Sequence, residues 1–323
     1  MKNAKTTIQS FNEWGKLREV FIGITDDMVE PEYIKALQWM PKKDIKIMKE
    51  FSGKRSIDVL PKKMKILKKQ VNELVKVLQD HGIKVNRNIP LRYKEEKKFL
   101  NDVQKGCHLT GGADFFRVIG NNVILLNNLR LPCRRKQIYS VRPVLEKILK
   151  NSNARYVAAP PASPHYNEND IFLEGGDIMI DDYNVYVGKS GNASNDAGID
   201  WLQQFLGSQY KVYTIKLSPH VLHIDCVCAL TREGLLTYCP DVVVGELPKP
   251  LRSWKKIETR PEETFGANGL TLNKNTIVTA VQYERVNNEL HKNGMNVIPL
   301  PLDMCIAYGM GARCLTGVIT RDE

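Results

Sequence analysis

The sequence lacks any stretch that would direct it to a membrane or to the secretory route. Residues 1–20 are polar and contain no apolar core of the kind that signal peptides carry. No apolar run approaches the roughly 20 residues that a membrane-spanning helix needs. We therefore expect a cytoplasmic protein without a membrane partner.

Paired cysteines and linker-like segments are also missing. The chain has seven cysteines, and an odd number without a secretory signal argues against a disulfide framework. We expect free thiols, most of them inert in the core. Because no low-complexity segment divides the 323 residues, a single catalytic domain over residues 1–323 is expected.

Basic residues outnumber acidic ones, and the formal net charge is +11. A basic chain can bind polyanions, so a non-enzymatic basic binding protein is one alternative. However, the lysines and arginines are spread widely, and the densest stretch, residues 61–69, has the pattern of the solvated face of an amphipathic helix. We therefore expect no nucleic-acid partner.

The clearest organisation is an internal repeat that starts with two short strands around a polar turn. Glycine, asparagine and aspartate in these turns can adopt the positive φ that tight hairpins need. Four such hairpins are predicted: 115–119 with 123–127, 177–180 with 185–188, 226–230 with 235–239, and 269–272 with 276–280.

Each hairpin is followed by a helical pattern and then by another short apolar strand. The strongest helix is predicted over 64–80, before Gly82 and a strand at 83–85. Partial copies of the unit stand at 17–23 and 313–319. About five units predict an α/β fold, a closed five-bladed propeller, although an open α/β sheet could be built from similar elements.

Polar residues with chemical potential recur just before the first strand of each hairpin. Neighbouring glycines would let backbone and substrate approach closely. The residues at this repeat position are Asp114, Glu174, His223 with Asp225, Asn268, and Cys314. Singly, each has a structural explanation, such as a turn cap or a buried thiol, but their recurrence at one place in the repeat favours a shared site.

A zinc site is the first alternative to consider for this set. His223 and Asp225 are two residues apart on an expected strand and so share one face, whereas Cys226 and Cys228 share the other. Zinc ligation by His223, Cys226, Cys228 and Cys239 is thereby disfavoured, because the ligands would point apart. We expect core packing for Cys226 and Cys228, with no metal and no other cofactor.

The residue types suit a guanidinium, which is planar, permanently cationic and rich in hydrogen-bond donors. Carboxylates of Asp114, Asp225 and Glu174 could hold it through charge-assisted bonds. Its central carbon is a poor electrophile, so the reaction needs a thiolate, from Cys314, and a proton for the departing amine, from His223.

The positive charges of Arg313 and of a protonated His223 would favour the thiolate form of Cys314. Arg313 is also expected to be one of the substrate-binding residues. The carboxylates around the sulfur would oppose it. The thiol is therefore expected to be activated mainly when the cationic substrate arrives.

The ordered motifs resemble the amidinotransferases of the guanidino-group-modifying superfamily, whose fold is a five-bladed α/β propeller. The resemblance covers most of the chain. It is carried by Asn12-Glu-Trp14 with 17–23, Asp114 with 118–121, Phe172-Leu-Glu-Gly-Gly-Asp177, His223-Ile-Asp225, and Gly311-Ala-Arg-Cys-Leu-Thr316.

The resemblance implies a role for each matching residue. Cys314 would be the nucleophile, His223 the general acid and base, and Glu174 the carboxylate that orients the histidine. Asp114 and Asp225 would hold the guanidinium, and Asn268 falls at a substrate-loop position.

An amidinotransferase is therefore expected, moving the amidino group from arginine or an arginine-like donor to an amine through a covalent amidino-Cys314 intermediate. A hydrolase of the same superfamily is the alternative, since the Glu174-Gly-Gly form is also typical of deiminases. Val242 stands where glycine amidinotransferase has an arginine for the donor's carboxylate, so the donor is left open. The expected partners are a small guanidino donor and an amine acceptor, and a homodimer is left open.

Overall fold

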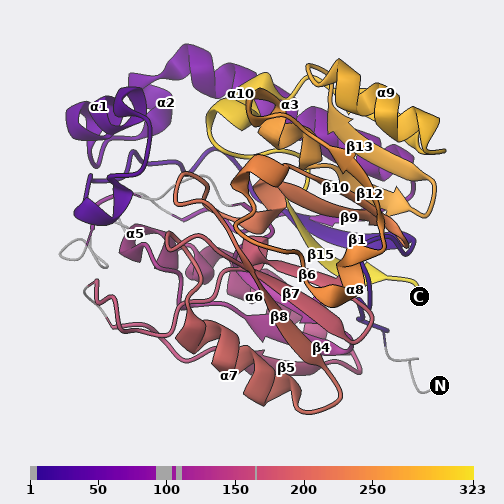
Figure 1. The fold of residues 1–323 in the computed structure, drawn as a ribbon. Helices are drawn as coiled ribbons and strands as arrows, with labels where there is room; N and C mark the ends of the chain where they lie inside the picture. The colour runs from indigo at the N-terminus through magenta and orange to yellow at the C-terminus, as the bar shows by residue number, and fades with distance from the viewer. Residues whose placement is uncertain (1–5, 92–103, 107–110, 164–165) are drawn as a thin grey trace.

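The computed structural model describes residues 6–91, 104–106, 111–163 and 166–323. Within these residues the strands form five sheets of three strands each. In every sheet two strands pair antiparallel, and the third lies parallel to the central one. This is the predicted hairpin, helix and strand unit, and the α/β propeller with five blades is confirmed (Figure 1).

Four blades follow one another along the chain. Their strands are β3 Phe116–Ile119, β4 Asn122–Leu125 and β5 Arg155–Ala158; β6 Ile178–Asp181, β7 Asn184–Lys189 and β8 Lys211–Lys216; β9 Cys228–Arg232, β10 Leu235–Tyr238 and β11 Lys255–Glu258; and β12 Leu270–Asn273, β13 Thr276–Ala280 and β14 Asn296–Leu300. All four predicted hairpins form, with ends shifted by one or two residues.

The fifth blade joins the two ends of the chain. Strand β1 (Leu17–Ile22) pairs antiparallel with β15 (Thr316–Arg321) and parallel with β2 (Lys84–Asn86). Each end of the chain holds only part of the repeat unit, so pairing β15 with β1 completes the last blade. The partial copies predicted at 17–23 and 313–319 are these two strands.

Helices follow the hairpins and lie outside the strands. They are α1 Lys42–Phe51, α2 Ser56–Val59, α3 Pro61–Asp80, α5 Pro132–Arg135, α6 Ile138–Leu149, α7 Asp196–Leu206, α8 Lys249–Arg252, α9 Glu284–Lys292 and α10 Asp303–Ala307. In Figure 1, α3 and α9 run along one edge of the molecule and α7 along the opposite edge, with the strands between them.

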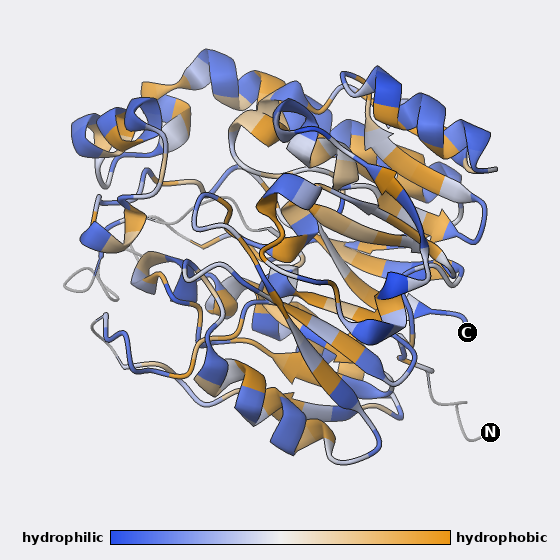
Figure 2. Cartoon of the chain, in the orientation of Figure 1, coloured by the Kyte–Doolittle hydropathy of each residue, from blue (hydrophilic) through white to orange (hydrophobic). Residues whose placement is uncertain are grey.

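The predicted amphipathic helix α3 buries its apolar stripe and exposes its lysines. Met64, Leu67, Val71, Leu74 and Leu78 are buried, whereas the lysines between 61 and 69 are exposed. Figure 2 shows this alternation as blue and orange turns along α3. The predicted solvated face of the basic stretch is therefore confirmed.

One local prediction is wrong. His223 and Asp225 do not lie on a strand, because Ile224–Cys226 forms a short 3-10 helix and β9 begins only at Cys228. The carboxylate of Asp177, 47 residues earlier in the chain, accepts the backbone N–H of Ile224 at 3.1 Å, so this N–H is not available for strand pairing. The turn changes the direction of the side chains that follow it.

In the part of the chain that the structure describes, none of the helices is both long and apolar enough to cross a bilayer. The prediction that residues 1–323 form one domain stays a prediction.

Candidate active site

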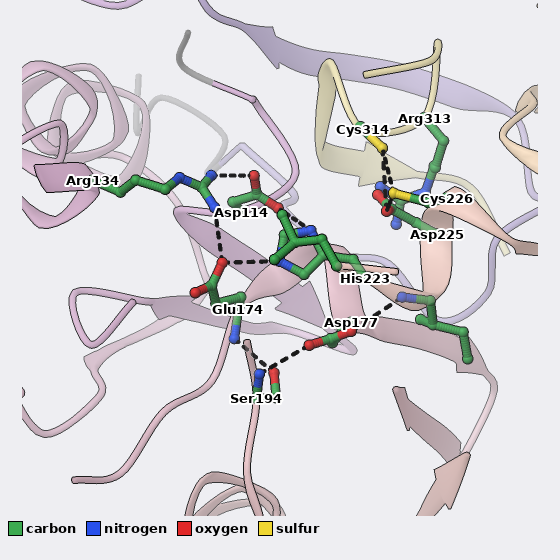
Figure 3. Close-up of polar contacts among 12 residues, drawn as sticks. Asp114, Arg134, Glu174, Asp177, Ser194, His223, Asp225, Cys226, Arg313 and Cys314 are labelled. Carbon is green, nitrogen blue, oxygen red and sulfur yellow. Dashed lines mark hydrogen bonds and ion pairs between the residues drawn. The ribbon is translucent and has the colours of Figure 1, made fainter. Parts of the chain in front are cut away.

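The predicted site residues all lie in turns just before the first strand of a blade. Because the five blades are arranged around one centre, equivalent turns meet there. Asp114 precedes β3, Glu174 precedes β6, His223 and Asp225 precede β9, Asn268 precedes β12, and Cys314 precedes β15. The repeat thus brings residues that are far apart in sequence into one region (Figure 3).

His223 is held between two carboxylates. Its Nε2 lies 2.9 Å from Oε2 of Glu174, and its Nδ1 lies 3.6 Å from Oδ1 of Asp114. Burial alone would lower the pKa of His223, but the negative charges of Asp114 and Glu174, with that of Asp177, outweigh it and raise the pKa well above its usual value. The surrounding carboxylates therefore favour the protonated imidazole, the form that a proton donor requires.

Arg134, on α5, enters the same cluster and was not predicted. Its guanidinium pairs with Asp114 and donates to Oε2 of Glu174 at 2.9 Å (Figure 3). Burial would raise the pKa of Glu174, but Arg134 and His223 lower it to about 2. Glu174 is consequently an ionised partner for both cations.

The thiol of Cys314 lies in a second cluster. Its Sγ donates to Oδ1 of Asp225 at 3.2 Å and accepts from Nδ2 of Asn268 at 2.8 Å. Burial raises the pKa of Cys314 well above its usual value, and the neighbouring Cys226 and the charge of Asp225 raise it further. The group at rest is therefore a thiol rather than a thiolate.

Two glycines let the parts of the site approach one another. A Cβ on Gly176 would lie 2.7 Å from both Oδ1 of Asp114 and Nδ1 of His223. A Cβ on Gly111 would lie 2.9 Å from Oδ2 of Asp114 and 3.3 Å from the carbonyl oxygen of Cys314. The Asp114 turn is also joined to the Cys314 turn directly, because the N–H of Ala113 donates to the Cys314 carbonyl at 3.2 Å.

Two carboxylate oxygens in this region have no hydrogen-bond donor in the part of the chain that the structure describes. Among the described residues, Oδ1 of Asp114 and Oδ2 of Asp225 are buried and accept no hydrogen bond. Burying an acceptor without a donor costs about 1–3 kcal/mol. Both belong to the residues that were expected to hold a guanidinium, and a cation with several N–H donors would satisfy them.

Arg313 lies beside Asp225 (Figure 3), but its ion pair is with Glu13. Its Nη2 lies 3.3 Å from Oε2 of Glu13, and its Nη1 donates to the carbonyl of Thr316. Glu13 belongs to the opening Asn-Glu-Trp motif and also pairs with Arg117. The Arg313 guanidinium is therefore committed to a structural ion-pair network, and its role in substrate binding stays a prediction.

Asp177 holds the loops around Glu174 and His223 in place through hydrogen bonds to the backbone. Its two oxygens accept the backbone N–H groups of Ile224 and Ser194, both at 3.1 Å, and the hydroxyl of Ser194 accepts the N–H of Glu174 at 3.1 Å. Burial raises the pKa of Asp177 to about 7. The Gly-Gly-Asp part of the motif thus fixes the loops that carry Glu174 and His223.

Cys226 and Cys228 are buried in the hydrophobic core, as predicted. The predicted direction of the Cys226 side chain is wrong, however, because its Sγ lies 3.6 Å from Oδ1 of Asp225 and 3.8 Å from Sγ of Cys314. The 3-10 turn at Ile224–Cys226 is the reason. Asp225, Cys226 and Cys314 offer three ligand atoms within 4.8 Å of one another, a different set from the zinc ligands considered above.

Sequence reasoning missed Arg134 and misplaced Cys226. Nothing distinguishes Arg134 among the 47 lysines and arginines of the chain. Cys226 directly follows Asp225, and this position could have indicated a place in the site. It was assigned to the opposite face because a strand was assumed where the structure has a 3-10 turn.

Residues 46–321 match the sequence family described as N,N dimethylarginine dimethylhydrolase, eukaryotic. The chain belongs to this family. The match contains all five turns that carry candidate residues and ends at Arg321, the last residue of β15.

Relatives with named activities include amidinotransferases. The chain is 24% identical over 287 residues to the L-arginine:L-lysine amidinotransferase of Pseudomonas savastanoi pv. phaseolicola, which covers 80% of this chain and 76% of the relative. It is 33% identical over 157 residues to the Bacillus subtilis protein YkgA, covering 48% of this chain and about half, 54%, of that protein's length.

The fold matches solved amidinotransferase structures. Inosamine-phosphate amidinotransferase StrB1 from Streptomyces griseus superposes with a TM-score of 0.80 at 20% identity, over 98% of this chain and 97% of that chain. The predicted resemblance to the amidinotransferases, and with it the expectation of an enzyme of this superfamily, is confirmed.

Proposed function

We propose that the protein is an amidinotransferase that moves the amidino group from arginine, or an arginine-like donor, to an amine through a covalent amidino-Cys314 intermediate. One observation carries the proposal. The thiol of Cys314, hydrogen-bonded to Asp225 and Asn268, lies in the same ring of turns as the His223–Glu174 pair. A nucleophile, a proton donor and acceptors for a cation are thus present together.

The donor guanidinium binds to the open oxygens of Asp114 and Asp225. Its positive charge offsets the carboxylate next to the sulfur, lowers the pKa of Cys314, and the thiol proton leaves to solvent. Binding therefore creates the nucleophile, which explains why the thiol is protonated when no substrate is present.

The thiolate then attacks the central guanidino carbon, and the protonated imidazole of His223 gives its proton to the departing amine. This amine is ornithine if arginine is the donor. The amidino group remains on the sulfur as a cation. Neutral His223 next takes a proton from the acceptor amine, which attacks the same carbon and displaces the thiolate.

Arg134 affects how the donor guanidinium binds to Asp114. Its guanidinium already pairs with Oδ2 of Asp114, so the donor shares this carboxylate with a residue of the chain or displaces it. Since Cys314 and His223 are only 4% and 3% exposed, segments around the site have to move before a substrate reaches the sulfur.

A hydrolase is the second candidate, because the matched family is described by a dimethylarginine hydrolase and Glu174 stands in the Glu-Gly-Gly form. In that reaction His223 would protonate the terminal nitrogen, which leaves as an amine or ammonia in place of ornithine. Water would then attack the remaining alkylamidino-Cys314 intermediate and release citrulline, with Cys314 still the nucleophile. In either case we infer a small guanidino donor as partner. A cytoplasmic location, a homodimer and the absence of a nucleic-acid partner stay predictions.

Incubation with arginine, with and without a panel of amines, followed by mass analysis of the products separates the candidates. Ornithine plus a new guanidine, formed only when an amine is present, supports the transferase. Citrulline or ammonia without an amine means a hydrolase. Binding to a polyanion that weakens steeply with salt, without any turnover, would mean a basic binding protein.

The variant Cys314→Ala tests the nucleophile, with Cys305→Ala, a buried thiol on α10, as its control. We expect Cys314→Ala to abolish turnover and the covalent adduct, while the control retains both. Retained turnover in Cys314→Ala would end the proposal.

A further inference from the structure

A second cysteine touches the candidate nucleophile and has no part in the reaction proposed above. Sγ of Cys226 lies 3.8 Å from Sγ of Cys314, and the two residues are 88 positions apart in sequence. Both are buried, at 5% and 4% exposed. Figure 3 shows the two sulfurs directed toward one another beside Asp225.

The two thiols are close enough to be joined after a small local shift. A disulfide needs a sulfur–sulfur distance of about 2.05 Å, so the separation must shorten from 3.8 Å. Both residues precede the strands of their blades: Cys226 ends the 3-10 turn before β9, and Cys314 lies in the turn before β15. Neither backbone segment belongs to a sheet ladder, so the turns can adjust without breaking strand pairing.

We propose that Cys226 is a resolving thiol, which forms a reversible disulfide with Cys314 when the protein meets a peroxide. This inference rests on the contact between the two sulfurs and not on the proposed amidino transfer. The disulfide removes the nucleophile from use and stores it in a form that a thiol reductant restores.

The oxidation proceeds in two balanced steps. The thiol of Cys314 first loses its proton, and its sulfur then attacks one oxygen of hydrogen peroxide and breaks the O–O bond. This gives a sulfenic acid and hydroxide, which takes up the released proton to form water. The sulfur of Cys226 then attacks the sulfenic sulfur, and hydroxide leaves. In sum, two thiols and one peroxide give one disulfide and two waters, so the sulfurs are oxidised and the peroxide is reduced.

The other described cysteines, Cys133, Cys228, Cys239 and Cys305, are also buried free thiols. Cys226 is singled out by geometry, because its Sγ is in contact with Sγ of Cys314.

Without a resolving thiol, a sulfenic acid on Cys314 would be open to a second peroxide and would reach the irreversible sulfinic state. The disulfide with Cys226 would therefore inactivate the site reversibly and would also protect Cys314 from irreversible oxidation. The same neighbours, with Asp225, could instead hold a soft metal ion, so the test is carried out with a chelator present.

The experiment treats the full chain with hydrogen peroxide, in chelator, and analyses unreduced peptides by mass spectrometry. We expect one species in which the peptides carrying Cys226 and Cys314 are linked with the loss of two hydrogens. Dithiothreitol should separate them. Because the readout is the linkage itself, it holds whether or not the proposed transferase activity is found.

Cys226→Ser is the test variant, and Cys228→Ser, on β9, is the matched control. In Cys226→Ser, peroxide should add two or three oxygens to Cys314, and dithiothreitol should not reverse this; the control should form the linked peptides as the unchanged protein does. Accumulation of sulfinic Cys314 without any linkage in the unchanged protein would overturn the proposal. So would a disulfide of Cys314 to any other cysteine. The unchanged protein decides the question alone if Cys226→Ser does not fold.

Discussion

The side-chain amide of Asn268 donates to Sγ of Cys314 at 2.8 Å, while its carbonyl oxygen accepts the backbone N–H of Arg313 at 2.9 Å and that of Cys314 at 3.3 Å. One amide thus fixes both the turn and the sulfur of the candidate nucleophile. A donor aimed at the sulfur also stabilises the thiolate once it forms, since hydrogen bonds to the charged form lower a pKa.

Replacing Asn268 by Asp should slow turnover by about 10²-fold, the cost of losing one oriented donor at a developing charge. The carboxylate keeps an acceptor for the two backbone N–H groups but places a second negative charge beside the sulfur. The pH at which Cys314 becomes reactive should therefore rise, which the pH dependence of turnover measures. Asn287→Asp is the control, because the buried Asn287 bonds to the Ala280 carbonyl instead. An unchanged pH profile in Asn268→Asp would contradict this role.

Alkylation of Cys314 in the substrate-free protein should accelerate throughout a titration from pH 6 to pH 10. Burial and the charge of Asp225 hold the pKa of the thiol well above its usual value, so the thiolate fraction keeps growing as pH rises toward it. The rate of iodoacetamide addition, followed on the Cys314 peptide, measures this. A plateau reached below pH 8 would show that the resting sulfur is already a thiolate.

Glu174→Gln should lower the free energy of unfolding by about 3 kcal/mol at pH 7, because it leaves the buried cations of Arg134 and His223 without a shared partner. The pKa of Glu174 is lowered to about 2 from 4.5. A carboxyl with a lowered folded pKa contributes stability above its unfolded pKa and loses it as pH falls toward the folded one. The difference from the unchanged protein should therefore shrink between about pH 4.5 and pH 2.

Urea unfolding at several pH values measures this difference. The control is Glu146→Gln, which breaks an exposed pair with Arg142 and should cost well under 1 kcal/mol at any of these pH values. A difference for Glu174→Gln that stays constant as the pH falls would mean that the stabilisation is not tied to the ionised carboxylate.

Gly176→Ala should impair the reaction more than the fold. The added Cβ would lie 2.7 Å from Nδ1 of His223 and from Oδ1 of Asp114, so the two side chains must separate, and a displacement near 1 Å can cost about 10² in rate. Gly82→Ala serves as the control: its φ of +72° makes alanine strained at about 1–2 kcal/mol, but nothing of the site is near. Equal losses of kcat in the two variants at matched stability would contradict a local effect.

The sequence by itself determined the repeat unit and its chemistry. Hairpin turns, the apolar stripe of α3 and the polar residue before each first strand are local patterns, set by backbone preference and burial over a few residues. They were sufficient to predict five α/β blades and to select Asp114, Glu174, His223, Asp225 and Cys314 as a common site. The two end segments were recognised as incomplete copies of the unit, whereas their pairing as β1 and β15 came from the structure.

Only the tertiary structure decided what each of these side chains faces. Arg134 pairs with Asp114 and Glu174 because α5 brings it there, and a positive charge in a basic chain has no local mark of such a partner. Cys226 meets Cys314 because the carboxylate of Asp177, from the preceding blade, accepts the Ile224 N–H and turns the backbone into a 3-10 helix. Contacts of this kind depend on packing between segments distant in the chain, which local sequence patterns do not encode.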